Sequence, residues 1–98
     1  MVKRRITIVW DNLAIIHLTA IYNYYYPLSP KSANKIRVEI LNAVSQLDVY
    51  PESGIYDELY NARYLVVWHW RIYYLYDNSR VAILKIFDMR QNPNNFEL

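Results

Sequence analysis

Apolar residues recur at helical spacing in the segment that follows Asp11. They lie four, three and four residues apart, at Ala14, Leu18, Ile21 and Tyr25. This spacing predicts one face of an amphipathic helix. Asp11 is a candidate N-cap, because its carboxylate can accept hydrogen bonds from the backbone N–H groups of the first turn. The helix is predicted to end at Tyr26, since a following proline disfavours helical conformation.

A second helical pattern begins at Ser29. Ser29 is placed as an N-cap and Pro30 at the first helical position, where the missing N–H of proline has no cost. Apolar residues then repeat every three or four positions, at Ala33, Ile36, Ile40, Val44 and Leu47. Pro51 and Gly54 indicate a loop that ends this helix. Two helices with so short a connection are expected to pack as an antiparallel hairpin.

Strand-like runs account for most of the remaining chain. They are rich in β-branched and aromatic residues and cover residues 6–10, 63–67, 70–76 and 80–87. Short connections between the last three predict an antiparallel meander, which the first strand must join, at its edge or its centre. The prediction is an α+β fold of order β-α-α-β-β-β, with the helical hairpin on one face of a mainly antiparallel four-stranded sheet.

Composition narrows the class of protein. Ninety-eight residues predict one domain, with residues 93–98 as a flexible tail. The chain has no cysteine, which excludes disulfides and thiolate metal sites. No apolar run approaches about 18 residues, so we expect no membrane span. The basic start is followed by Thr7, Asp11 and Asn12 and not by an uninterrupted apolar region, so we expect no signal peptide and a cytoplasmic protein. The net charge of +2 is lower than the strongly positive charge that is typical of a dedicated nucleic-acid-binding protein.

The two histidines do not suggest a metal site. His17 is predicted on the polar side of the first helix, and His69 lies in the tight connection between two strands. No third ligand stands at a recognisable spacing. We therefore expect no metal and no cofactor.

Three segments resemble a known family when taken in order. They are Arg63-Tyr-Leu-Val-Val, Trp70-Arg-Ile-Tyr-Tyr and Phe87-Asp-Met-Arg-Gln-Asn-Pro93. With the order of elements, they resemble the RelE/ParE toxins of type II toxin–antitoxin systems, plasmid-stabilisation proteins, over residues 6–93. The last segment is similar to one ParE-like branch. The resemblance implies a growth-inhibiting toxin that a cognate antitoxin neutralises. Members either cut mRNA in the ribosomal A site or poison DNA gyrase.

The resemblance also suggests roles for individual residues. Arg63 stands where the ribonucleases of the family keep a catalytic arginine, Arg90 lies where another is found, and Arg71 adds a third positive charge. Glu58 is a candidate base. The lysines that some of these nucleases carry before Arg63 are missing, as is a Tyr or His after the last strand. We therefore favour ParE-like action on gyrase. A ribosome-dependent mRNA endonuclease and a non-toxic antitoxin-binding family member remain alternatives.

Two interpretations of the three arginines are possible, target binding and ion pairing within the sheet. We expect Arg63, Arg71 and Arg90 to bind the target from the sheet face that the helices leave open. The alternative is that they pair with acidic side chains on neighbouring strands and contribute little to stability. The acidic candidates are Asp57, Glu58 and Asp88.

Aromatic residues crowd the end of the first helix, at Tyr22, Tyr24, Tyr25 and Tyr26. Successive helical residues point about 100° apart, so the core cannot bury all four. The hypothesis is that Tyr22, Tyr24 and Tyr26 contact the antitoxin. The resemblance implies that the antitoxin lays a helix on the hairpin, often adds a strand to the sheet, and assembles with the toxin into a heterotetramer.

Overall fold

The computed structural model describes residues 6–91, which form two helices, one short 3₁₀ turn and five strands. In chain order the elements are β1 (Thr7–Trp10), α1 (Asn12–Tyr25), α2 (Pro30–Ser45), η1 (Gln46–Asp48), β2 (Ile55–Asp57), β3 (Ala62–Val67), β4 (Trp70–Tyr76) and β5 (Arg80–Asp88). The predicted tail at 93–98 lies outside the described residues.

The strands form one sheet in the order β1-β5-β4-β3-β2. β1 runs parallel to β5, and the other pairs are antiparallel. The prediction of four strands was wrong, because Ile55–Asp57 pairs with β3 as a fifth strand. Three residues are too few to show the alternation by which a strand is recognised in a sequence. The sequence left open whether the first strand lies at the edge or in the centre of the sheet. In the structure, β1 lies at the edge.

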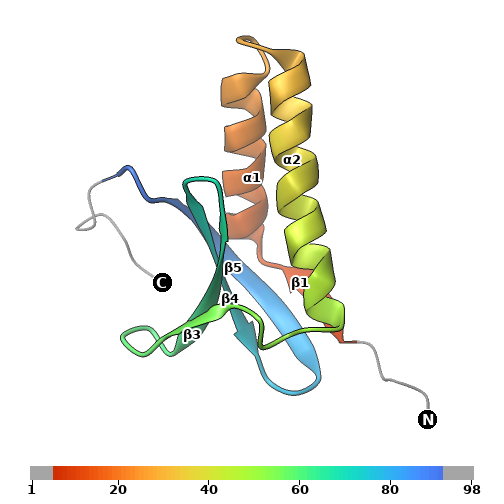
Figure 1. Ribbon diagram of the computed structural model, residues 1–98, viewed down its shortest axis with the longest axis vertical. Helices are drawn as coiled ribbons and strands as arrows, with labels where there is room; N and C mark the ends of the chain where they lie inside the picture. The colour runs from red at the N-terminus through yellow and green to blue at the C-terminus, as the bar shows by residue number, and fades with distance from the viewer. Residues whose placement is uncertain (1–5, 92–98) are drawn as a thin grey trace.

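Both helices cover one face of the sheet, as predicted (Figure 1). The apolar stripe of α2 is buried, together with Ile72 and Tyr74 of β4 and Val81 and Ile83 of β5. The stripe of α1 packs on the same core, with Ala14 fully buried. The far end of the hairpin extends beyond the sheet (Figure 1). Residues near the α1–α2 connection therefore have no sheet beneath them.

The two predicted helix caps differ in the structure. The hydroxyl of Ser29 accepts the backbone N–H of Ser32 at 3.2 Å, which confirms Ser29 as the cap of α2. Asp11 occupies the N-cap position of α1, but its side chain makes no capping hydrogen bond. Its backbone N–H instead donates to the carbonyl of Ile83 at 2.9 Å. Asp11 thus ties the start of α1 to β5 through the main chain.

A buried tyrosine fixes the connection between η1 and β2. The hydroxyl of Tyr74 donates to the carbonyl of Pro51 and accepts the N–H of Gly54, both at 2.9 Å. Burial raises the pKa of Tyr74 above its ordinary value, so this hydroxyl keeps its proton. The contact holds β2 beside β3 and sets the surroundings of Arg63.

Candidate functional site

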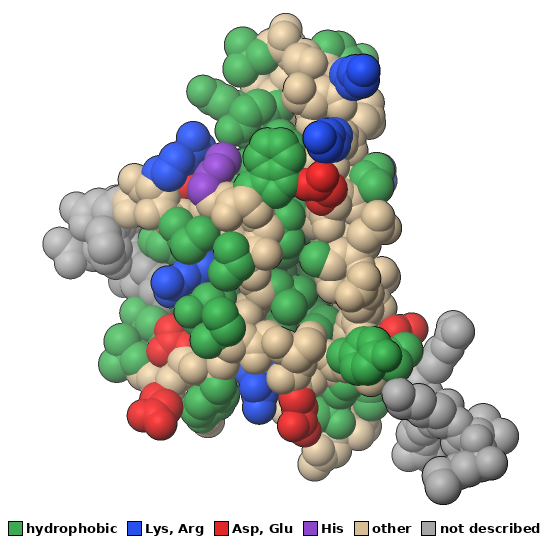
Figure 2. Space-filling model, viewed as in Figure 1, with side chains coloured by type: hydrophobic (Ala, Val, Ile, Leu, Met, Phe, Trp, Pro, Cys, Tyr) green, Lys and Arg blue, Asp and Glu red, His purple; other side chains and the backbone are tan. Residues whose placement is uncertain are grey.

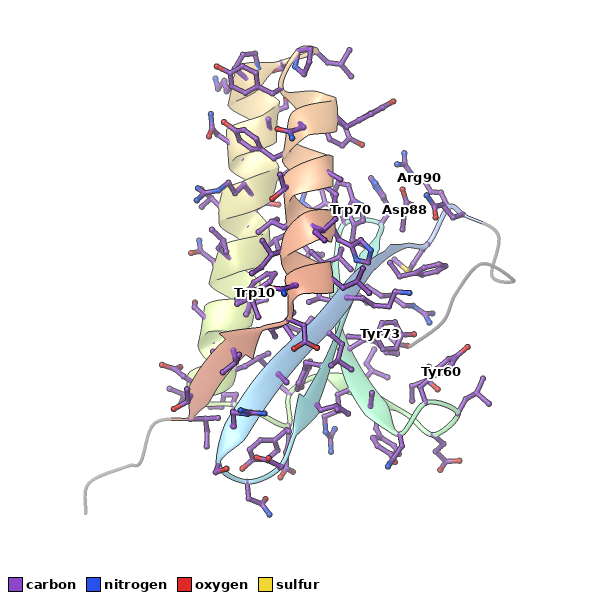
Figure 3. All side chains as sticks on the ribbon, turned by 180° about the vertical axis from the view of Figure 1, so that it is seen from behind. Trp10, Tyr60, Trp70, Tyr73, Asp88 and Arg90 are labelled. Carbon is purple, nitrogen blue, oxygen red and sulfur yellow. The ribbon has the colours of Figure 1, made fainter. Side chains whose placement is uncertain are left out.

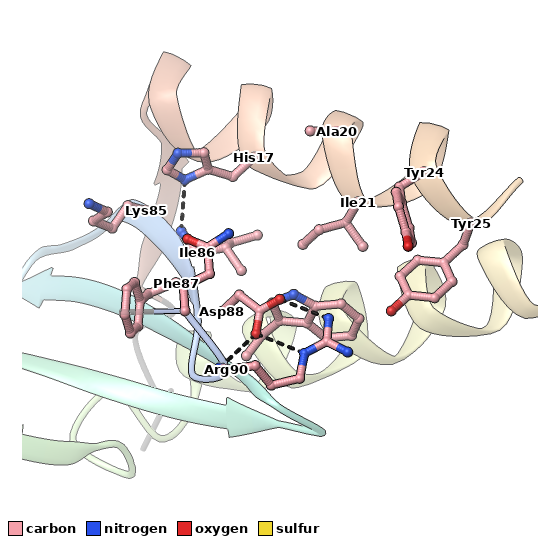
Figure 4. Close-up of a pocket in the computed structure, with 12 residues that line it drawn as sticks. His17, Ala20, Ile21, Tyr24, Tyr25, Lys85, Ile86, Phe87, Asp88 and Arg90 are labelled. Atoms are coloured by element: carbon pink, nitrogen blue, oxygen red, sulfur yellow. Dashed lines mark hydrogen bonds and ion pairs between the residues drawn. The ribbon is translucent and has the colours of Figure 1, made fainter. Parts of the chain in front are cut away.

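A groove of about 600 Å³ lies between α1 and the C-terminal half of β5 (Figure 4). One wall comes from α1, and the other from the end of β5 and the residues that follow it. The lining side chains are His17, Ala20, Ile21, Tyr24, Tyr25, Trp70, Lys85, Ile86, Phe87, Asp88, Arg90 and Gln91. The groove brings together residues from two of the predicted sites, Tyr24 from the antitoxin site and Arg90 from the target site.

Aromatic packing makes the base of this groove rigid. The ring of Tyr25 meets that of Trp70 edge-on, with 6.0 Å between centroids. Trp70 is almost completely buried and Tyr25 partly so. Such edge-to-face pairs contribute about 0.5–1.5 kcal/mol beyond the area that they bury. The C-terminal half of α1 is therefore held against β4 while its outer face stays open.

His17 faces the sheet, which corrects its predicted place on the polar side of α1. Its Nδ1 accepts the backbone N–H of Ile86 at 3.1 Å (Figure 4). Burial first, and then the nearby Lys85 ammonium, lower the pKa of His17 below its ordinary value of 6.5. The imidazole is therefore neutral at pH 7 and carries its proton on Nε2.

Arg90 forms a two-pronged ion pair with Asp88 at the end of the groove. Its Nη2 and Nε donate to the two carboxylate oxygens at 2.9 and 3.1 Å. The pair holds the pKa of Asp88 below its ordinary range, chiefly through these hydrogen bonds. The Arg90 side chain is 61% exposed, so solvent screens the pair and its contribution to stability is small. Arg90 thus has an acidic partner, two residues away along the chain.

Arg63 binds main-chain carbonyls. Its Nη1 donates to the carbonyl of Gly54 at 3.0 Å and to that of Glu52 at 3.2 Å. Its guanidinium also lies 5.6 Å from the centre of the Tyr56 ring. These contacts brace the segment that leads into β2, so the arginine has a structural role in this conformation.

Arg71 lies in an aromatic setting on the sheet face away from the helices. Its guanidinium stacks 4.4 Å from the centre of the Tyr64 ring, and its Nη1 donates to the Tyr73 hydroxyl at 3.3 Å. Tyr73 in turn donates to the Asp57 carboxylate at 3.3 Å. The hydrogen bond to Tyr73 is the main reason why the pKa of Arg71 is raised. Figure 3 shows Tyr73 on this face, away from the helices.

The three arginines do not share one surface, and this corrects the expectation that the open sheet face presents them all. Arg63 pairs with Tyr74 and Arg71 with Val66, so strand alternation points the two arginines to opposite faces. Asp88, which holds Arg90, pairs with Trp70, four residues from Tyr74 along β4. That spacing corresponds to roughly 13 Å. Figure 2 likewise shows the Lys and Arg side chains of one face scattered among hydrophobic ones.

Glu58 does not join any of these arginines. It is exposed in the turn between β2 and β3. Among residues 6–91 the only acidic side chain ion-paired with an arginine is Asp88. The four residues considered for ribonuclease chemistry therefore do not converge on one point.

The tyrosines at the end of α1 are not all buried, as helical geometry predicted. Tyr25 packs against the core, whereas Tyr24 is 67% and Tyr26 47% exposed. Tyr22 is partly buried, and its ring lies 5.5 Å from that of Tyr26. Aromatic surface is thus presented near the tip of the hairpin, and Tyr24 also lines the groove.

His69 lies beside Asp88 and Trp70. Its Nε2 lies 4.0 Å from an Asp88 oxygen, too far for a hydrogen bond, and its ring packs on Trp70. Within residues 6–91, no three side chains of the metal-ligating types are grouped to hold an ion. Nor does that part of the chain include a helix with the length and apolarity needed to cross a membrane.

Reasoning from the sequence missed the groove because its walls come from segments far apart. The position of His17 in the sequence does predict that it lies on the side of α1 that faces the sheet. It lies three residues after Ala14 and four before Ile21, on the buried side of the helix. Nothing in the sequence pairs it with Ile86, 69 residues away.

Comparisons with known proteins agree with this geometry. Residues 8–93 match the model of the ParE toxin of type II toxin–antitoxin systems. A solved structure described as the chromosomal ParDE toxin–antitoxin system from P. aeruginosa is similar, with a TM-score of 0.74 and 25% sequence identity. The similarity covers 86% of this chain and 96% of the solved chain. The search of curated proteins found no match. The chain belongs to the ParE toxin family.

Proposed function

We propose that this protein inhibits growth by binding DNA gyrase, and that a cognate antitoxin neutralises it by docking in the groove between α1 and β5. Family membership supports the toxin role. The observation that carries the docking site is the groove itself, beside an exposed and uncharged helix face. We further propose that toxin and antitoxin are cytoplasmic. In the neutralised complex, they form a heterotetramer.

The outer face of α1 suits a partner helix. No Lys, Arg, Asp or Glu occurs between Asn12 and Tyr25. Exposed residues follow one another at steps of three, four and four, at Leu13, Ile16, Ala20 and Tyr24. An amphipathic helix is recognised through apolar side chains at such spacing. The last two of these residues also line the groove, so one partner helix would contact both surfaces.

The arrangement of cations favours protein binding over RNA cleavage. Metal-free cleavage of RNA needs several cations and a proton-transferring group around one phosphate. Arg63 is engaged with carbonyls, Arg71 lies on the opposite sheet face, and Arg90 is paired with Asp88. This separation supports a target that is held by a protein surface.

Expression of the chain without its antitoxin tests the proposal. We expect growth arrest with DNA double-strand breaks and an SOS response, relieved when the cognate antitoxin is co-expressed. Rapid transcript cleavage with intact replication would instead indicate the endonuclease. Normal growth would indicate a family member that binds antitoxin without toxicity.

Substitution of exposed tyrosines tests the docking site. Tyr24→Ser and Tyr26→Ser should each weaken antitoxin affinity, measured by calorimetry on purified proteins. Tyr24 should have the larger effect, since it lines the groove. Tyr50→Ser, which alters an exposed tyrosine outside the groove, serves as the matched control. Equal affinity for all four proteins would refute this location.

A further inference from the structure

The turn between β3 and β4 places a tryptophan in a backbone conformation that bulky residues avoid. Val67 pairs with Trp70, so the turn consists of Trp68 and His69 alone. Trp68 has a φ of 56°, in the left-handed region, where such turns favour glycine or asparagine. The other two non-glycine residues with positive φ among residues 6–91 are both asparagines, which tolerate this region. The conformation of Trp68 therefore costs stability.

Two side chains of α2 hold the indole in one orientation. The indole Nε1 donates to the Glu39 carboxylate, and the Lys35 ammonium lies 5.7 Å from the centre of the ring. Glu39 and Lys35 are one helical turn apart, so both reach the tip of the β3–β4 hairpin from the same face of α2. Trp68 nevertheless remains 54% exposed. The ring is thus fixed in place while about half of the residue faces solvent.

Contacts within the chain offset little of the strain in this turn, because so much of the indole stays in water. A strained residue that is held at the surface points to a function. Tryptophan is among the side chains most enriched at the centres of protein–protein interfaces, and a ring already fixed in one orientation loses little entropy on binding. We propose that Trp68 anchors the toxin to gyrase, with Glu39 and Lys35 as positioning residues. This inference rests on the proposed function for the identity of the target.

The surface around Trp68 carries positive charge. Lys31 lies one helical turn before Lys35 on the exposed face of α2, and neither lysine forms an ion pair within residues 6–91. The carboxylate of Glu39 is engaged by the indole. Interfaces place charges of opposite sign against each other. The gyrase surface that receives Trp68 is therefore an apolar pocket with an acidic rim.

The anchor lies beside the groove in which we place the antitoxin. Trp68, Lys35 and Glu39 do not line that groove, but Trp70, two residues further along the chain, does. An antitoxin helix in the groove would lie next to the β3–β4 turn. It would block the approach of a target as large as gyrase without binding to Trp68. The two partners therefore need different residues, and they exclude each other by their size.

Replacement by glycine tests the anchor, because glycine accepts the backbone conformation of the turn. Trp68→Gly should remain folded in urea denaturation. Its affinity for purified gyrase without DNA, measured by calorimetry, should fall about 30-fold, whereas its affinity for the antitoxin should stay within about twofold of the wild-type value. Leu59→Ser removes an exposed apolar side chain from the β2–β3 turn. It is the matched control, and it should bind both partners as the wild type does.

Two further variants test the neighbours of the indole. Glu39→Ala should weaken gyrase binding about fivefold through loss of one hydrogen bond, and Glu39→Gln, which keeps an acceptor, should restore it. Lys31→Glu alters an exposed side chain and leaves the fold intact. It should lower gyrase affinity about fivefold at low salt, and the difference should shrink as salt is added. Unchanged affinity of Lys31→Glu at low salt would overturn the acidic rim.

The outcomes separate the anchor from the proposed function. Equal gyrase affinity of Trp68→Gly and the wild type would overturn the anchor and leave gyrase as the target. Loss of antitoxin affinity with unchanged gyrase affinity would assign Trp68 to the antitoxin, which also overturns the anchor. A wild-type toxin that does not bind gyrase would refute the proposed function and the anchor together.

Discussion

At the scale of single residues, the structure leaves no room for a side chain at Gly54. A Cβ added there would lie 2.6 Å from the Tyr74 hydroxyl oxygen and 2.9 Å from the carbonyl oxygen of Tyr64. The second contact is with a strand backbone that cannot move without disturbing β3. Glycine is therefore required at this point by close approach.

We predict that Gly54→Ala lowers the free energy of unfolding by about 1–3 kcal/mol, the usual cost of overpacking. The added methyl group forces Tyr74 away from Gly54 and Pro51 and weakens both hydrogen bonds. Urea denaturation gives the value. Ser53→Ala, at the neighbouring exposed position, should change stability by less than about 0.5 kcal/mol. Equal stability of the two variants would show that the packing is looser than described.

The sequence predicted the exposure of side chains better than it predicted their contacts. Helical geometry predicted that the core could not bury all four tyrosines at the end of α1, and this is confirmed, since Tyr24 and Tyr26 are exposed. The contacts of Arg63 did not follow, because they depend on a three-residue strand whose pattern is too short to read. The prediction that His17 lies on the polar side of α1 was wrong, because its spacing to Ala14 and Ile21 puts it on the side that faces the sheet.

At the scale of elements, the two helix starts give a matched comparison. Ser29 caps α2 with its side chain, whereas Asp11 makes no side-chain cap at α1. We predict that Ser29→Ala lowers the free energy of unfolding by about 1 kcal/mol. Asp11→Ala should cost about 0.5 kcal/mol, because only the attraction of its carboxylate to the helix N-terminus is lost. Urea denaturation of both variants provides the test, and a larger effect for Asp11 would contradict the assignment of the caps.

The helices and the long strands could be predicted because each carries a full period of its pattern. The stripe of α2 is buried as expected, and β3, β4 and β5 lie within one residue of their predicted bounds. The faces of the sheet on which the arginines lie could not be predicted. They depend on register, and the β5 ladder contains an irregularity between Tyr73 and Tyr74. A shift of one residue reverses the face of every side chain that follows.

At the scale of the whole molecule, two half-buried histidines make stability depend on pH. Burial is the main cause that lowers the pKa of both His17 and His69 below 6.5. The folded protein therefore binds fewer protons than the unfolded chain just below pH 6.5. The free energy of unfolding should be highest above pH 6.5 and should decrease as the pH falls below it.

Urea denaturation at pH 8 and pH 5 measures this effect. The wild type should be less stable at pH 5, and a His17→Gln, His69→Gln double variant should show a smaller difference. The lowered pKa of Asp88 acts in a separate window, since its contribution is lost only as the pH falls below its ordinary value of 3.8. A wild type that is equally stable at pH 8 and pH 5 would contradict the described burial of the histidines.

Neutralisation of toxicity by the antitoxin is the measurement that tests the central claim most directly. Ala20 is exposed on α1 and lines the groove, so Ala20→Arg would place a long charged side chain in the groove where we propose that the antitoxin docks. Val38→Arg, on the exposed face of α2, is the matched control. Growth is measured for each toxin variant with and without co-expressed antitoxin. We predict that both variants arrest growth alone and that only the Val38→Arg toxin is neutralised. Full neutralisation of the Ala20→Arg toxin would show that the antitoxin does not bind in this groove.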